Sequence, residues 1–417
     1  MAAEIPGFYY DEERGRYFKI TNTGQAVARG MDGYSKSHLA NKEREIADKK
    51  RRTEGQIKPI YLHKLALYEK LQSPCLRTRE DLAVQLVGKR CCPQKWMIDG
   101  GYGADNIESM GYDPVKDEVI LGLRSGRGYG FNRSLEEYKM VRPFTSRVTS
   151  IDISGRMLLM TSFGSGGHGG RVTLSEIVDD ADEEAEGRRV GIYVQNNLIE
   201  FFGDKKETIW SSKLLDGGGR VIVGGKNKVN VWHDLKGPVS TNHFHTGSDC
   251  LTVDGRDEDA IVGVGCRNGK VKLYDCREQH HETVQSIKHG SSVTKMQRID
   301  DRYVVVSGVE DNLALYDLRY LSNQNNTGYK RDRSGERKST RPIIKYYGYE
   351  NRMNMDHGFS INKGTYLAVS SRNHVNIYDV RNGSLLNQLE GMANCLAWDN
   401  FGCLYVGQRD CFLRHTI

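Results

Sequence analysis

The residue types that carry most enzyme catalysis are present in this chain, but they do not stand at catalytic spacings. The sequence contains no Gly-x-Ser-x-Gly or Gly-Lys-Ser/Thr motif, and no pair of carboxylates has a spacing typical of acid–base chemistry. The run Gly164–Gly170 is glycine-rich enough to surround a phosphate, but it lacks the lysine and the following helix pattern of such loops. We interpret it as a flexible loop. His243 and His245 alternate as strand residues do. We therefore expect no enzyme activity and no small-molecule substrate.

The cysteine pattern gives little indication of a metal site or of disulfide bonds. The nine cysteines form no Cys-x-x-Cys pair, and Cys91 and Cys92 are adjacent, which is poor geometry for one metal ion. We expect no metal and no cofactor, and reduced thiols of an intracellular protein, nuclear or cytoplasmic. The acidic start, with Glu4 and Asp11–Glu13, does not fit a signal peptide, and no apolar run is long enough to suggest a membrane span.

Two stretches share one pattern, Ala260–Arg277 and Tyr303–Arg319. Each has a β-rich run, a polar turn, a second alternating run and a Tyr-Asp-x-Arg ending. Asn268-Gly269 predicts a two-residue type I′ turn, which needs positive φ at both positions. Tyr274 and Tyr316 are 42 residues apart, the period of a four-stranded propeller blade. With 46 glycines and only 8 prolines, the composition also favours many short strands and turns.

Seven hairpins of this kind can be proposed along residues 91–417, which predicts an all-β, seven-bladed β-propeller. They are Glu118–Asn132, Val190–Phe202, Val221–Asp234, the two stretches above, Tyr366–Arg381 and Leu404–His415. The chain stops in a strand, so a strand near Trp96 should complete the final blade, because an unpaired edge leaves backbone groups unsatisfied.

Two insertions interrupt the period, at 177–188 and 320–342. Tyr316 and Tyr378 are 62 residues apart, and the excess lies in 321–341, a polar run with little to bury, which we expect to be a disordered loop. The first insertion is acidic in six of the eight positions 179–186 and suggests a solvated tip.

Residues 1–90 form a separate extension that we expect to be partly helical and partly disordered. Phe8–Tyr10 and Tyr17–Ile20 predict a hairpin or an extended peptide whose aromatic side chains dock either on the chain's own propeller or on a partner. Residues 36–54 are rich in both charges, as in a solvated helix, and Lys49–Arg52 is also compatible with a nuclear-import patch. Residues 61–71 have helical apolar spacing.

The stretch Ser307–Asp317 resembles the WD-repeat (WD40) signature, with Tyr316 in place of the usual Trp. We expect Asp311 to accept hydrogen bonds from backbone amides at the turn and Ser307 to bond to the ring on the third strand. His289 stands roughly where such repeats carry a histidine.

A closer resemblance comes from the N-terminus. Pro6, Gly7, Phe8, Tyr9, Tyr10 and Asp11, followed by Arg16, Tyr17 and Phe18, are similar to the opening of the cullin-4-associated factors, which are WD-repeat substrate receptors. The run at 265–269, the two Asp-x-Arg endings and Val406-Gly407-Gln408 also look like that family. The resemblance covers the first twenty residues and roughly 250–417.

The resemblance implies a non-catalytic receptor that docks on the damaged-DNA-binding protein 1 adaptor of a cullin-4 ubiquitin ligase and presents protein substrates. The docking residues carried over are Arg277 and Arg319, steadied by Asp275 and Asp317, because residues two apart on a strand share a face. Arg381 ends a third copy. Such guanidinium groups suit carboxylates and carbonyls on a partner. Alternatively, each arginine only satisfies its own aspartate.

A different class of partner is also compatible with the sequence. The net charge of +6 is too small to imply nucleic acid by itself, but Lys49–Arg52 and Lys330–Arg341 are basic clusters. They leave open a propeller scaffold in an RNA- or chromatin-associated complex. Salt-sensitive binding to heparin or RNA would favour that alternative.

Overall fold

The computed structural model divides the chain into two compact units, residues 1–59 and 60–417, which are considered separately. It describes residues 8–11, 16–19, 94–97, 105–114, 116–132, 137–164, 167–177, 199–202, 207–235, 239–257, 259–277, 283–320, 340–352, 357–362, 364–400, 402–409 and 411–416. The predicted insertions, except for residue 177 and the ends of the second one, the helices predicted at 36–54 and 61–71, and both basic clusters except residues 340 and 341 lie outside these ranges.

The described residues of the first unit form an antiparallel pair. β1 (Phe8–Asp11) pairs with β2 (Arg16–Lys19), with Phe8 opposite Lys19 and Asp11 opposite Arg16. Of the two alternatives that the sequence left open for this segment, the backbone forms the hairpin.

The second unit is built from seven four-stranded antiparallel sheets, here called blades 1 to 7. In each blade the strands are named a to d from the inside outward. The a strands are β4 (Ile107–Asp113), β8 (Val148–Ser154), β12 (Ile209–Leu215), β16 (Cys250–Asp254), β20 (Val293–Arg298), β24 (Phe359–Asn362) and β28 (Cys395–Trp398). The b strands are β5 (Glu118–Leu123), β9 (Met157–Ser162), β13 (Arg220–Gly225), β17 (Ile261–Cys266), β21 (Tyr303–Gly308), β25 (Tyr366–Ser371) and β29 (Cys403–Gly407).

The outer half of each blade completes the sheet. The c strands are β6 (Arg127–Asn132), β10 (Arg171–Glu176), β14 (Lys228–His233), β18 (Lys270–Asp275), β22 (Leu313–Asp317), β26 (His374–Asp379) and β30 (Cys411–Thr416). The d strands are β7 (Glu137–Pro143), β11 (Ile199–Phe202), β15 (Ser240–His245), β19 (Thr283–Lys288), β23 (Ile344–Lys345), β27 (Leu385–Glu390) and β3 (Gln94–Met97). Two 3₁₀ turns occur among the described residues, η2 (Asp216–Gly218) and η3 (Leu318–Tyr320).

The blades form a closed ring. Each a strand contacts the a strand of the next blade, and β28 of blade 7 contacts β4 of blade 1. Blade 7 is completed by β3, with Trp96 opposite Phe412. The Trp96 ring lies 5.2 Å from that of Phe412 and 5.3 Å from that of Phe131 in blade 1. The predicted closure by a strand near Trp96 is therefore confirmed, and so is the seven-bladed, all-β fold.

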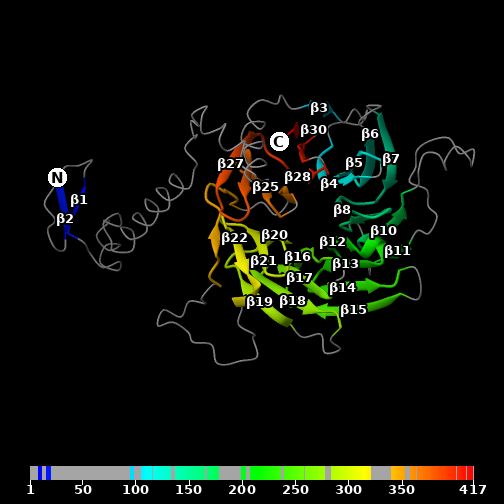
Figure 1. Cartoon of the computed structure of the whole chain (residues 1–417), viewed down its shortest axis with the longest axis horizontal. Coiled ribbons are helices and arrows are strands. Elements are labelled where there is room, and N and C mark those ends of the chain that lie inside the picture. Colours follow the sequence, from blue (N-terminus) through cyan, green and yellow to red (C-terminus); the bar gives the residue numbers. More distant parts are fainter. Residues whose placement is uncertain are drawn as a thin grey trace, which may run out of the picture. The chain divides into compact units, whose positions relative to one another are not determined.

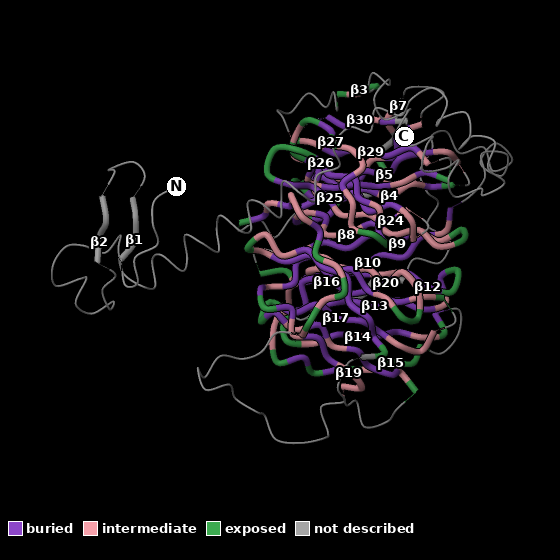
Figure 2. Tube along the Cα trace, turned by 60° about the vertical axis from the view of Figure 1, so that its left-hand side comes forward, coloured by how far each residue is buried: buried purple, intermediate pink, exposed green. Residues whose placement is uncertain are grey.

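The core lies between neighbouring blades, where the tube in Figure 2 is mostly purple. Val271 and Leu273 of blade 4 pack with Val304 and Val306 of blade 5, for example. The packing is tight enough to demand glycine: a Cβ on Gly265 would lie 2.5 Å from the Val293 side chain of the next blade. Part of the high glycine content thus reflects the close approach of blades.

The predicted 42-residue period marks equivalent buried positions. The c strands of blades 4, 5 and 6 each have a tyrosine as their second-to-last residue, Tyr274, Tyr316 and Tyr378, and each is at most 2% exposed. Six of the seven predicted hairpins coincide with b–c pairs.

The prediction of Val190–Phe202 as the hairpin of blade 2 was wrong. In this blade β9 pairs with β10, and β11 pairs with the other edge of β10. The connection between β9 and β10 passes through the glycine-rich run 164–170, whose turn potential the sequence analysis treated only as loop. Residues 190–198 lie outside the described ranges.

The turn at Asn268-Gly269 also differs from its prediction. Gly269 has a φ of +78°, but Asn268 is not in the left-handed region, and the loop spans the three residues Arg267–Gly269 between β17 and β18. Two consecutive positive φ values occur instead at Glu310 and Asp311 in blade 5, at +61° and +58°. The hairpin was correctly predicted and the turn type was not.

Candidate functional site: paired arginines on one face of the ring

The ring has two faces that differ in which connections they carry. Because adjacent strands are antiparallel, every a–b turn and every c–d connection lies on one face, and every b–c turn and d–a connection lies on the other. We call the first the Arg277 face and the second the Arg372 face, after a residue on each. The two Asp-x-Arg endings predicted as a docking feature both lie on the Arg277 face, at the ends of β18 and β22.

The guanidinium of Arg277 is held by Asp275 as a two-pronged ion pair. Nε donates to Oδ1 at 3.0 Å and Nη2 donates to Oδ2 at 2.6 Å, while the backbone N–H of Arg277 also donates to Oδ1 at 2.9 Å. The Asp275 side chain is only 11% exposed, but that of Arg277 is 76% exposed. The carboxylate therefore fixes the orientation of a cation that projects into solvent.

Blade 5 repeats this geometry. Arg319 donates from Nε to Asp317 Oδ1 at 3.0 Å and from Nη2 to Oδ2 at 2.6 Å, and its backbone N–H donates to Oδ1 at 2.9 Å. Its guanidinium also lies 5.7 Å from the centre of the Tyr303 ring, in a cation–π contact. The Arg319 side chain is 48% exposed and the Asp317 side chain 5%. Neighbouring blades thus present two equivalent forks.

The two ion pairs lower the pKa values of the aspartates. The pKa of the Asp275 carboxyl is held below its usual range, chiefly by the hydrogen bond from Arg277, and the pKa of Asp317 is lowered in the same way by Arg319. Both carboxyls are therefore charged at neutral pH, as a fixed orienting partner of arginine must be.

The third Asp-x-Arg copy, in blade 6, does not form a fork. The backbone N–H of Arg381 donates to Asp379 Oδ1 at 2.8 Å, but Asp379 Oδ2 is taken by the side-chain amide of Asn382 at 2.8 Å. Among the described residues, the Arg381 guanidinium has no ion pair. Asn382 has replaced the arginine as the partner of the carboxylate, which distinguishes this copy from the other two.

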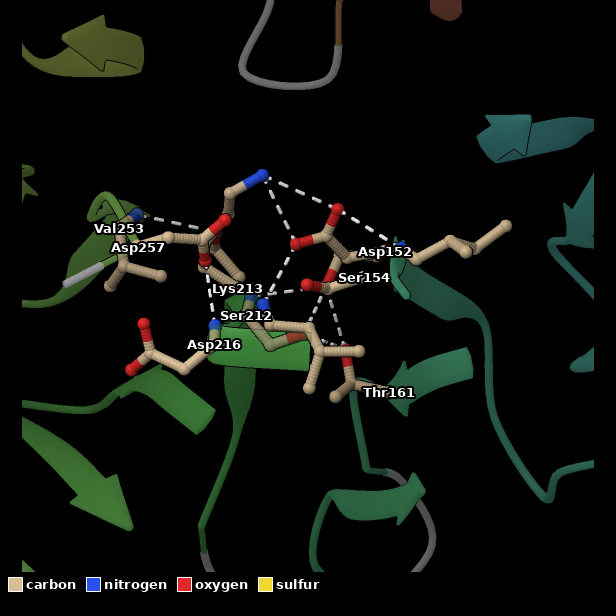
Figure 3. A network of polar contacts seen from close by, with 12 residues as sticks. Asp152, Ser154, Thr161, Ser212, Lys213, Asp216, Val253 and Asp257 are labelled. Atoms are coloured by element: carbon tan, nitrogen blue, oxygen red, sulfur yellow. Dashed lines mark hydrogen bonds and ion pairs between the residues drawn. The ribbon is translucent and has the colours of Figure 1, made fainter. Parts of the chain in front are cut away.

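Polar contacts between blades fix the surface on which the forks stand. Asp152 of blade 2 accepts from the ammonium of Lys213 in blade 3 (Figure 3). It also accepts from the backbone N–H of Leu214, at 2.7 Å. The charge of Asp152 is the main cause that raises the pKa of Lys213. The Asp216 N–H of blade 3 donates in turn to Asp257 of blade 4 at 2.6 Å.

Blades 4 and 5, which carry the forks, are joined by ion pairs and hydrogen bonds. Arg298 at the end of β20 is 3% exposed and donates to Asp259 Oδ2 of blade 4 at 2.6 Å and to the Ile261 carbonyl at 3.1 Å. Arg256 of blade 4 pairs with Asp301 of blade 5. These contacts between the blades hold Arg277 and Arg319 at a fixed spacing.

A cavity that the sequence analysis did not predict opens beside Arg277. It has a volume of about 600 Å³ and lies between blades 3 and 4, where its lining includes Arg220, His233, Asn242, Asp259 and Arg277. Its residues come from separate blades, so no local pattern in the sequence could reveal it. A partner that contacts Arg277 meets this recess directly.

The residues predicted from the WD-repeat signature form a polar network on the other face. His289 bonds to the Tyr316 hydroxyl at 2.9 Å. Ser307 contacts Tyr349 and His357 of the next connection, at 2.8 and 2.9 Å, rather than the Tyr316 ring. Asp311 accepts from the backbone N–H of Asn351 at 2.7 Å, so it joins its own turn to the connection before blade 6.

The N-terminal motif is described only at the level of the backbone. Phe8, Tyr9 and Tyr10 lie in β1, and Tyr17 and Phe18 lie in β2, while Pro6 and Gly7 lie outside the described residues. Its docking partner stays a prediction.

Searches of the described residues for other kinds of site give two findings. No group of three or more His, Cys, Asp or Glu side chains in this part of the chain gathers as ligands of a metal would. No helix in the same residues has the length and apolar character needed to cross a bilayer.

Comparison with known proteins agrees with the fold. No family model matches the chain. The chain is similar to WD repeat-containing protein 21 of Schizosaccharomyces pombe, with 25% identity over 370 residues that cover 83% of this chain and 80% of that protein. Together with the seven four-stranded blades, this similarity identifies the second unit as a WD40-type β-propeller, an architecture suited to a protein-interaction scaffold.

Proposed function

We propose that this protein is a non-catalytic substrate receptor that docks through Arg277 and Arg319 on the damaged-DNA-binding protein 1 adaptor of a cullin-4 ubiquitin ligase. The observation that carries the proposal is the pair of equivalent Asp–Arg forks on neighbouring blades, each with a nearly buried carboxylate and an exposed guanidinium. The 76% exposure of the Arg277 side chain leaves most of its guanidinium accessible to a partner.

The energetics suit a docking site. The forks are ordered before binding, so little side-chain entropy is lost when a partner's carboxylates or carbonyls meet them. Oriented arginines are frequent hot-spot residues in protein interfaces. The recess between blades 3 and 4 adds polar side chains beside Arg277, among them Asn242 and Asp259, and we expect an adaptor segment to contact them.

Co-purification tests the proposal. Tagged wild-type protein and the double variant R277A/R319A are expressed in cells that contain the cullin-4 ligase, and the captured adaptor is quantified. We expect the wild type to retain the adaptor and the double variant to lose it. The matched control is R381A, which removes an exposed arginine from the copy that forms no fork and should capture the adaptor at the wild-type level.

Thermal unfolding of the same samples separates docking from folding. Surface substitutions usually change stability by about 0.5 kcal/mol or less, so R277A/R319A should melt near the wild type. An unfolded variant would mean that the arginines stabilise the fold and are not primarily docking residues. Full capture by a folded double variant, or release of the captured material by moderate salt together with RNA, would favour the nucleic-acid-associated scaffold instead.

A further inference from the structure

The Arg372 face, opposite the docking forks, carries a distinct concentration of basic side chains. The b–c turns of five blades place an exposed basic residue there, and the d–a connection before blade 6 adds Arg352; the turn residues are Arg124, Lys226, Arg267, Arg372 and Arg409. Their backbones are held in place, as when Arg267 N–H donates to the Asp249 carbonyl and Arg372 N–H to the Glu350 carbonyl.

Two acidic side chains on this face are less exposed than the arginines that they pair with. Glu108 is 11% exposed, 3.8 Å from both Arg124 and Arg147. Asp249, 25% exposed, pairs with Arg267 at 3.1 Å. These carboxylates orient the arginines above them and leave positive charge outermost.

A cavity of about 270 Å³ lies in this face between Arg352 and Arg372. Its walls include Ser370 and Ser371, which are 6% and 5% exposed, and the apolar side chain of Met392, which is 49% exposed. Within the described residues, neither guanidinium has an ion pair or a side-chain hydrogen bond. A volume at the small end of ligand pockets suits one or two side chains of a larger partner.

The two serines add donor capacity. Ser371 Oγ accepts the backbone N–H of Glu350 at 2.9 Å, and Ser370 Oγ accepts that of Ala393 at 3.2 Å. Across the described part of the chain, neither hydroxyl donates a hydrogen bond. Buried hydroxyl donors that lack an acceptor are costly, so a ligand that brings acceptor oxygens into the cavity would be favoured.

We propose that this cavity binds a carboxylate side chain from an acidic segment of a protein partner. The carboxylate would accept from the guanidinium groups of Arg352 and Arg372 and from the serine hydroxyls, while Met392 contacts the aliphatic part of the bound residue. The binding site stands on this geometry alone; its description as the substrate site of a ubiquitin-ligase receptor rests on the proposed function.

The observations favour a peptide over a nucleic acid. A phosphodiester chain needs a continuous basic track, and exposed Glu310 and partly exposed Asp311 interrupt the basic turns at blade 5, next to the cavity. Glu350 also lines the cavity itself. A peptide can place its acidic residues beside the arginines and other residues beside these carboxylates.

Selection from a random twelve-residue peptide library tests the inference on the full chain. Peptides retained by the wild type should be enriched in Asp and Glu, and that enrichment should disappear with R352Q/R372Q, which keeps a polar side chain, shorter than arginine, and removes both charges. The variant R277A/R319A, altered on the other face, should retain the same acidic peptides even if it has lost the adaptor. Failure of this site and failure of adaptor docking are thereby distinguished.

A selected acidic peptide then gives the size of the effect. Measured by fluorescence polarisation, it should bind R352Q/R372Q at least tenfold more weakly than the wild type, and replacement of its acidic residues by their amides should weaken binding to the wild type equally. Selection without acidic enrichment, a loss smaller than tenfold, or tighter binding of a single-stranded RNA of the same charge at the same site would overturn the proposal.

Discussion

At the scale of residues, the decisive feature is how each arginine is held. Asp275 and Asp317 are nearly buried and charged, and each engages both Nε and Nη2 of its arginine. This fixes the plane of the guanidinium, which a lysine ammonium at the same position cannot reproduce. Docking should therefore depend on the shape of the cation as well as on its charge.

The lysine substitutions R277K/R319K test that dependence. They preserve both charges but not the two-pronged geometry, so we expect adaptor affinity to fall by at least tenfold, with a melting temperature near that of the wild type. Biolayer interferometry with purified adaptor measures the loss. Wild-type affinity in R277K/R319K would show that only charge matters at these positions.

His289 gives the fold a pH dependence whose sign follows from its burial. Desolvation lowers the pKa of this 2% exposed imidazole from its ordinary value of 6.5 to about 4. Between these values the unfolded chain binds a proton that the folded chain does not, so stability is present above pH 6.5 and is lost as pH falls toward 4. The slope should be about 1.4 kcal/mol per pH unit.

Urea unfolding between pH 4 and 7 measures this slope. H289Q should be less stable at pH 7, because the bond to Tyr316 is altered. Its free energy of unfolding should depend less steeply on pH, by the slope that one bound proton contributes. The control H374Q changes an exposed histidine in β26 and should keep the wild-type slope. Parallel curves for H289Q and the wild type would mean that another group carries the dependence.

At the scale of elements, closure of the ring depends on β3. This strand precedes the first blade in sequence and completes the last one, and Trp96 is its main contact with the core. We expect W96A to destabilise the protein by about 2–3 kcal/mol, below the usual cost for a fully buried Trp because this side chain is half-buried. Chemical denaturation measures it.

Lys95 provides the matched control for β3. It lies in the same strand with its side chain exposed, so K95A should leave stability within about 0.5 kcal/mol of the wild type. Equal stability of W96A and K95A would mean that the ring does not rely on the Trp96 contacts.

The sequence predicted those elements whose signals are local. A β-rich run, a polar turn and a Tyr-Asp ending lie within eighteen residues, and the hairpins built on them were correctly placed. Blade 2 was misread because the glycine-rich run 164–170 was interpreted only as a loop and because alternating residues near Ile192 offered a competing pattern. The pairing of each Asp with the Arg two residues later was also predicted, but the reason differs from the predicted one, because Arg277 follows the end of β18 and Arg319 lies in η3.

What the sequence could not predict involves contacts between blades. The cavity beside Arg277 and the one beside Arg372 are lined by segments far apart in the chain, and no spacing reports which loops meet. The difference between the true forks and Arg381 lies in one neighbour, Asn382, whose amide takes the carboxylate.

At the scale of the whole molecule, the polar segment between β22 and β23 of blade 5 should be dispensable for folding. The cost of closing a loop rises slowly with its length, so replacing residues 321–339 by a short Gly-Ser linker should leave the melting temperature nearly unchanged. Extending the replacement through Thr340 should cost about 1–2 kcal/mol, because Thr340 exchanges two hydrogen bonds with Lys288 at 2.9 Å each. Differential scanning calorimetry compares the two. A large loss in the shorter replacement would show that 321–339 packs on the ring.

The two faces of the ring suggest that each binds a different kind of partner. The Arg277 face presents a pair of fixed cations suited to one constant partner, and the Arg372 face presents a basic surface with a small cavity suited to variable acidic segments. A receptor that joins an adaptor to its substrates needs both, and the rigid ring keeps them apart.

The most direct test of the central claim is the affinity of purified wild-type protein, R277A, R319A and the double variant for the purified cullin-4 adaptor, measured by calorimetric titration. Each single substitution should cost about 2–4 kcal/mol of binding free energy, and the double variant should show no measurable binding while remaining folded. A folded double variant that binds the adaptor as tightly as the wild type would contradict the account.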